Sequence, residues 1–137
     1  MEYTEEEGAR RVAEFMAKHD ARPVKGTYAM ATEGSKTERG GVVVNASTGI
    51  VIEGHRVARV GDTVRYADGS ESKIVSGAGF AAAYKRQPIA IVGSATDNGD
   101  TIINSLQNRS KIREFADDDG IAGLLQAGYI PPETVAA

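Results

Sequence analysis

The chain has 137 residues, sixteen of them glycine, with no cysteine, no tryptophan and two histidines. That length suits one small domain, alone or with tails. Without cysteine no disulfide can form, and two histidines are too few for an ordinary zinc site held by one chain. The net charge of −3 mixes both signs, which argues against a nucleic-acid partner. No apolar run is long enough to span a bilayer, so we expect no stable membrane anchoring.

The first residues, Met1 to Glu7, are acidic, and no apolar stretch follows them. This pattern excludes a conventional secretory signal peptide. We therefore expect a cytoplasmic protein that, if it is exported, leaves by a route that needs no signal peptide.

Residues 1–22 are predicted to form an amphipathic helix. Thr4 and Glu7 have capping-box spacing, and acidic residues in the first turn suit the helix dipole. One narrow apolar stripe runs along this segment, and Pro23 ends the pattern. The stripe is made of Ala9, Val12, Ala13, Met16 and Ala17.

Residues 23–105 are predicted to form an all-β domain of short strands. Short β-branched runs alternate here with Gly, Asp, Asn and Ser, which is typical of strands separated by turns. Asp68-Gly69 and Asn98-Gly99 are favourable hairpin turns. The runs are residues 42–44, 49–52, 57–60, 73–75, 89–92 and 101–103.

Residues 106–137 are predicted to form a C-terminal extension with short helical pieces. Ser110 can cap a helical turn that carries Ile112 and Phe115, and 121–127 can form a second short helix ended by Gly128. An extension of this size is too short to bury an independent core, which argues against a second independently folded domain there.

An internal repeat is the most informative feature of the sequence. Segments 29–37, 56–64 and 88–96 align, each with an alanine, then a glycine, then Ser or Asp. The glycine allows a sharp turn with positive φ, and the residue after it can accept hydrogen bonds from nearby backbone N–H groups. The unit therefore predicts a compact domain with approximate three-fold symmetry. Its aligned positions are Ala31, Ala58 and Ala90, then Gly34, Gly61 and Gly93, then Ser35, Asp62 and Ser94.

These repeats resemble the PAAR-repeat family. Segment 56–62, Arg-Val-Ala-Arg-Val-Gly-Asp, resembles the family's Pro-Ala-Ala-Arg and Val-Gly-Asp signature, and segment 88–94 resembles a second, degenerate copy. The resemblance extends over residues 24–105. Three shorter matches support it: Ile52-Glu53-Gly54-His55 before the motif, Val75-Ser76-Gly77-Ala78 between copies, and Arg39-Gly40-Gly41 at a strand start.

The resemblance implies a small mainly β cone that caps the trimeric VgrG spike of a type VI secretion system, one copy per trimer, and sharpens it for membrane puncture. The last rung of a β-helical trimer has open strand edges, and a pseudo-three-fold cap can pair with all of them. An effector or a loading chaperone is a further expected partner. Two alternatives stay open, the tip of a contractile phage-like tail spike and an effector adaptor acting through the terminal extensions.

The resemblance also places the tip, where the family usually holds zinc with His and Cys. The matching positions here are Arg39, Tyr66, Asp68 and Asn98, none of which is His or Cys. We therefore expect no cofactor and no transition metal at the tip, and a network in which Arg39 pairs with Asp68 as a fork and Asn98 and Tyr66 complete it. Whether some other metal binds at the tip stays open.

The partner-binding residues are predicted to be apolar positions of the repeat that lie in the core or near the base of the cone. They are Val57, Val60, Ile89 and Val92. The sequence carries neither a phosphate-binding Gly-x-x-x-x-Gly-Lys loop nor a Gly-x-Ser-x-Gly elbow, so no catalytic residues and no enzyme activity are expected.

Overall fold

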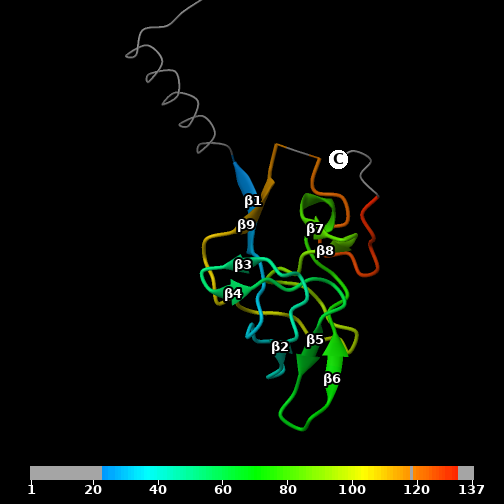
Figure 1. Cartoon of the computed structure of the whole chain (residues 1–137). Coiled ribbons are helices and arrows are strands. Elements are labelled where there is room, and N and C mark those ends of the chain that lie inside the picture. The colour runs from blue at the N-terminus through cyan, green and yellow to red at the C-terminus, as the bar shows by residue number, and fades with distance from the viewer. Residues whose placement is uncertain (1–22, 118, 133–137) are drawn as a thin grey trace, which may run out of the picture.

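The structure is a computed structural model that describes residues 23–117 and 119–132. It is mainly β, built of short strands (Figure 1). The helix expected over residues 1–22 lies outside the described residues. In chain order the elements are β1 (Val24–Ala29), β2 (Val42–Val44), β3 (Val51–Ile52), β4 (His55–Arg56), β5 (Thr63–Arg65), β6 (Glu71–Lys73), the 3-10 turn η1 (Gly79–Ala81), β7 (Ala83–Tyr84), β8 (Gln87–Pro88) and β9 (Lys111–Phe115).

Three alanines from distant parts of the sequence form a ring of backbone hydrogen bonds. The N–H of Ala58 donates to the carbonyl of Ala31, that of Ala90 to Ala58, and that of Ala31 to Ala90, at 2.8–2.9 Å. All three residues are completely buried. The predicted equivalence of the three repeats is therefore confirmed, and we call this set the alanine ring.

Each repeat continues from the alanine ring into a hairpin, and the three hairpins pair with one another around a common axis. β2 of the first repeat pairs with β5 of the second. Residues 73–75, at the end of β6 and just after it, pair with residues 95–97 of the third repeat, and residues 101–103 return to pair with 36–38 of the first. Because the circuit closes, none of the three hairpins is left as an open sheet edge.

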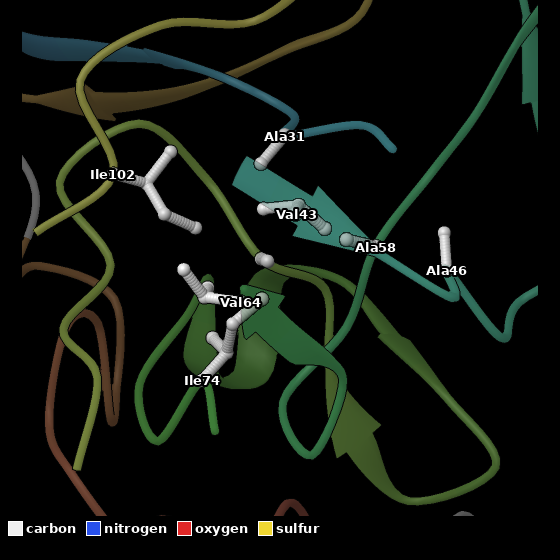
Figure 2. Packing of buried hydrophobic residues seen from close by; sticks show 8 residues of the cluster. Ala31, Val43, Ala46, Ala58, Val64, Ile74 and Ile102 are labelled. Carbon is white, nitrogen blue, oxygen red and sulfur yellow. The ribbon is translucent and has the colours of Figure 1, made fainter. Parts of the chain in front are cut away.

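A layer of branched aliphatic side chains lies next to the alanine ring inside the cone. Val43, Ile74 and Ile102 hold equivalent positions. Each carbonyl accepts a hydrogen bond from the N–H of the aligned glycine of its own repeat, which is Gly34, Gly61 or Gly93. Each of the three side chains is at most 1% exposed, and Figure 2 shows them packed with Val64, Ala31 and Ala58. Burying side chains of this size stabilises the fold by roughly 1.5–3 kcal/mol each.

Three two-stranded ribbons lie at the end of the cone opposite the β5–β6 hairpin (Figure 1). Two are tight hairpins, β3–β4 and β7–β8. The third is β9 paired with β1, the last and the first described strands. Arg56, Pro88 and Ala29 occupy equivalent places in these ribbons, because each carbonyl accepts a hydrogen bond from the preceding repeat of the circuit.

The C-terminal helices predicted from the sequence are wrong. The segment expected to form a helical turn after Ser110 is β9, because pairing with β1 satisfies its backbone groups. The segment 121–127 is a series of turns, with φ of +74° at Gly123 and +54° at Leu125. Leu125 donates its N–H to the carbonyl of Gly77, a contact that a continuous helix would not allow.

This C-terminal segment packs closely on the cone. A Cβ on Gly79 would lie 2.3 Å from the carbonyl oxygen of Ala122, so only glycine permits this approach. Leu124 and Leu125 pack around buried Ile91 in a second apolar cluster. No helix among the described residues has the length and hydropathy needed to cross a bilayer.

Candidate functional site

The narrow end of the cone is formed by the turns of the three repeat hairpins. The hairpin arms between equivalent core positions contain seven residues in the first and third repeats (36–42 and 95–101) and eleven in the second (63–73). The β5–β6 hairpin therefore projects furthest, as Figure 1 shows at its lower end. In each turn the glycine has φ between +83° and +88°, at Gly40, Gly69 and Gly99.

All four residues expected at the tip lie together around one shallow pocket. Arg39, Asp68 and Asn98 each directly precede the turn glycine of their hairpin, so they are equivalent by position in the turn. Tyr66 comes from the longer hairpin and packs against the main apolar cluster. The four positions that the resemblance places at the tip therefore also lie together in the fold.

The centre of the tip is a hydrogen-bond network around Asp100, a residue not expected from the sequence. The Tyr66 hydroxyl donates to Asp100 Oδ2 at 2.7 Å, and the N–H groups of Arg39 and Thr101 donate to Oδ1 at 3.0 and 2.8 Å. Asn98 Nδ2 in turn donates to the Tyr66 oxygen at 3.0 Å. We call Tyr66, Asn98 and Asp100 the tip network.

Asp100 is only 1% exposed, yet it is held as a carboxylate. Its burial acts to raise the pKa, but hydrogen bonds from Thr37, Tyr66 and the N–H groups of Thr101 and Arg39 outweigh burial and lower it. A position clue was present in the sequence: Asp100 follows the turn glycine, as Gly41 does in the first repeat. The Asp100 side chain of the third hairpin thus lies at the position where the first hairpin has Gly41, which has no side chain.

The predicted fork between Arg39 and Asp68 does not form. Arg39 Nη1 instead donates to the carbonyl of Asn98 at 3.0 Å. Asp68 accepts hydrogen bonds from its own turn, from the N–H of Ser70 at 2.9 Å and its hydroxyl at 2.6 Å. The Ser70 side chain is the main cause that lowers the pKa of Asp68. A carboxylate just before a turn glycine finds the nearest backbone donors first, so the longer-range pair loses the competition.

The tip residues do not fit a zinc ion. Arg39 stays protonated and would repel a cation, and the Asp68 carboxylate is already used by Ser70. Amide and phenol oxygens are poor ligands for zinc, which prefers thiolate and imidazole. No cluster of three or more His, Cys, Asp or Glu suited to a metal occurs among residues 23–117 and 119–132. The expectation of a metal-free tip stays a prediction.

The four residues expected at the partner interface separate into two groups. Val57 and Ile89 are buried inside the chain, at 0% and 2% exposed, and so cannot contact a partner without rearrangement. Val60 and Val92 are half-buried. Their backbone N–H groups bond the carbonyls of Pro88 and Ala29, so the two valines hold equivalent places in the second and third repeats.

The acid or hydroxyl after each repeat glycine accepts a backbone hydrogen bond, as predicted. Ser35 Oγ accepts from the N–H of Thr32 and Ser94 Oγ from Ile91, both at 2.9 Å. In the second repeat Asp62 accepts from the N–H of Arg59 at 2.8 Å. These bonds fix the turn that starts each hairpin.

Arg59 joins the second repeat to its neighbours. Its Nε donates to Ser47 Oγ at 2.8 Å and its Nη1 to the carbonyl of Tyr84 at 3.0 Å. Ser47 in turn donates its hydroxyl to Asp62 at 2.6 Å. The guanidinium therefore connects three segments and has a structural role in this chain.

The comparisons with known proteins agree with this geometry. The family model for the PAAR motif matches residues 33–104, just over half of the chain. No curated protein and no solved structure matches it. Members of the matched family are structural rather than enzymatic, and the partners they bind are spikes of the VgrG type. Their general role is at the spike tip of the type VI secretion system, and with the motif spread over all three repeats this chain belongs to the PAAR-motif family.

Proposed function

We propose that this protein caps a homotrimeric VgrG-type spike, one copy per trimer, with its β5–β6 hairpin forming the outer point. The cone offers two different ends, a narrow end closed by the tip network and a wider end that carries the three ribbons (Figure 1). The wider end is the one that can cover a blunt trimer. Secretion then carries the protein out of the cytoplasm together with the spike.

The alanine ring carries this proposal. A homotrimer presents the same surface three times around its axis, so a partner that contacts all three copies equally needs three-fold symmetry. One chain meets that need here, because Ala31, Ala58 and Ala90 are equivalent in backbone pairing and burial. The internal repeat thus gives one polypeptide the approximate three-fold symmetry that a second homotrimer would need three polypeptides to provide.

The cone is also built to stay rigid, as a puncturing device requires. Its repeat hairpins close on themselves, and no buried side-chain polar atom of the described residues lacks a hydrogen-bond partner. Satisfied polar groups in a closed sheet hold one conformation, because any distortion would leave some of them unpaired.

The decisive experiment is reconstitution with a VgrG-type trimer encoded beside this gene, followed by native mass spectrometry. One copy of this chain per three trimer subunits supports the proposal. Three copies per trimer, or no complex, contradicts it. If the partner encoded beside the gene is instead the spike of a phage-like tail, the same stoichiometry assigns the protein to that machine.

The contact surface is tested with charge substitutions at the two half-buried valines. We expect Val60→Glu and Val92→Glu to weaken binding to the trimer at least tenfold, because each places a carboxylate in an apolar contact. Ala67→Glu is the matched control, since Ala67 is exposed and lines the tip pocket. If Ala67→Glu weakens binding as much as the valine variants do, the narrow end is the one that docks.

A further inference from the structure

The β7–β8 ribbon carries a feature that its symmetry mate lacks. Both tight ribbons turn through two residues with positive φ, Glu53 and Gly54 in β3–β4 and Lys85 and Arg86 in β7–β8. Such two-residue turns favour Asn-Gly or Asp-Gly, because side chains strain this backbone conformation. Lys85 and Arg86 are therefore two adjacent cations held at a strained turn, where a glycine-containing pair would be more stable.

The two cations flank an apolar pocket. Phe80, which is 59% exposed, lines it together with Ala81–Ala83, Pro131 and Pro132. Lys85 and Arg86 lie at the same pocket and are both exposed. The Lys85 ammonium lies 5.5 Å from the centre of the Tyr84 ring. Among the residues that the structure describes, neither Lys85 nor Arg86 forms an ion pair with a carboxylate. An open aromatic surface beside two unneutralised cations matches a ligand that is both apolar and acidic.

We infer that the Phe80 pocket and the Lys85–Arg86 turn form a docking site for an acidic amphipathic segment of a second protein. A large apolar side chain of that segment sits against Phe80 and the two prolines, and carboxylates beside it contact Lys85 and Arg86. The charge pattern favours a protein over a polyanion such as nucleic acid. The whole chain has a net charge of −3, and two cations beside an apolar pocket do not make the extended basic row that phosphates require.

A contact with the trimer does not account for the Lys85–Arg86 turn, by a symmetry argument that rests on the proposed function. A homotrimer offers the same chemistry to each ribbon, so it gives no reason for one ribbon to carry Lys-Arg and its equivalent to carry Glu-Gly. The β3–β4 and β7–β8 ribbons lie on opposite sides of the molecule in Figure 1. The Lys85–Arg86 turn is thus suited to a partner that binds once per cap.

The test uses the full chain and a fluorescein-labelled peptide with a central Phe-Leu pair flanked by three Glu on each side. We expect saturable binding that weakens as salt increases, because the charged contacts are exposed. Two control peptides, one with Lys for every Glu and one with Ser for Phe and Leu, should bind about tenfold more weakly or not at all.

The key variant is K85N/R86G, which installs the preferred turn pair. It should weaken peptide binding about tenfold while leaving the Tm unchanged or higher, because the strain at the turn is relieved. Phe80→Ser should weaken binding as well, and Glu53→Gln at the equivalent ribbon should not. Loss of binding in a variant that is more stable cannot be attributed to misfolding.

Three results would overturn the proposal. They are equal binding of the Glu and Lys peptides, unchanged binding in K85N/R86G, and no saturable binding in the millimolar range. Self-association of the full chain that Phe80→Ser abolishes would assign the pocket to a second copy instead. Since every measurement uses the isolated chain, failure here leaves the trimer stoichiometry untouched, and failure of trimer capping leaves the peptide result standing.

Discussion

The Tyr66 hydroxyl donates a 2.7 Å hydrogen bond to the carboxylate of Asp100, and the two residues come from different repeats. The bond exists because the β5–β6 hairpin is longer than the hairpin that contains Asp100, so Tyr66 lies beyond it. The tip of the cone is therefore closed by an exception to the three-fold symmetry that organises its base.

We expect Asp100→Asn to lower the free energy of unfolding at neutral pH by about 1–3 kcal/mol, because an amide cannot accept every hydrogen bond that the carboxylate accepts. The pKa of Asp100 is lowered in the folded protein, so its contribution is complete above the unfolded pKa and is lost as pH falls through the folded pKa. Urea unfolding of both proteins from neutral to strongly acidic pH checks this. The gap between them should narrow below about pH 4, and a gap that stays constant would show that the charge of Asp100 is not involved.

Gly41→Ala should destabilise the tip by about 1–3 kcal/mol through overpacking. A Cβ there would lie 2.5 Å from Val64 Cγ1 and 2.9 Å from Tyr66 Cε1. The ring of Tyr66 must then move, and its resonances in NMR spectra should shift together with those of Asp100. Gly40→Ala is the control, because a Cβ at Gly40 meets nothing within 4 Å and the substitution strains only the backbone. Equal shifts of Tyr66 in both variants would count against the packing explanation.

Ala58→Val should destabilise the fold by about 1–3 kcal/mol, because the alanine ring is completely buried and has no room for two further methyl groups. Ala90→Val should have a similar effect, since the two positions are equivalent. Ala83→Val, on exposed β7, should change stability by less than about 0.5 kcal/mol. Thermal unfolding measures all three, and a neutral Ala58→Val would contradict the close packing at the axis.

The purified protein should contain no stoichiometric transition metal, and a chelator should leave its Tm unchanged. The tip residues offer one arginine and an aspartate already bonded to Ser70, which suits hydrogen bonding better than coordination. Arg39→Ala should lower the free energy of unfolding by no more than about 1 kcal/mol, because Arg39 is exposed. Elemental analysis decides the point, and about one zinc per chain after purification without added metal would refute it.

The repeated alanine, glycine and Ser/Asp pattern was enough to predict the three-fold core, because these features act over a few residues and recur. Asp68-Gly69 and Asn98-Gly99 likewise predicted their turns correctly. What the sequence could not show was competition between distant partners. Asp68 accepts hydrogen bonds from Ser70 and does not pair with Arg39. Asp100 lies at the centre of the tip network only because the longer hairpin brings Tyr66 to it.

The C-terminal segment shows the same limit more clearly. Residues 111–115 had turn-forming neighbours and helix-compatible side chains, yet their backbone pairs with β1 from the other end of the described chain. Leu125 adopts positive φ where its N–H reaches Gly77. In both cases tertiary pairing outweighs local preference, which is weak in a segment of this length.

The β1–β9 ribbon has one more consequence. Its two strands are not joined by a turn, whereas a hairpin turn joins the strands of the other two ribbons. At the end where that turn would lie, the N–H of Ala116 donates to the carbonyl of Pro23 at 2.9 Å. The fold therefore does not depend on which of its three ribbons is interrupted by the chain ends. A circular permutant that links residue 132 to residue 23 through a flexible linker, so that the C-terminal segment is kept, and opens the chain between Glu53 and Gly54 should assemble the same cone, with its new termini at the β3–β4 ribbon.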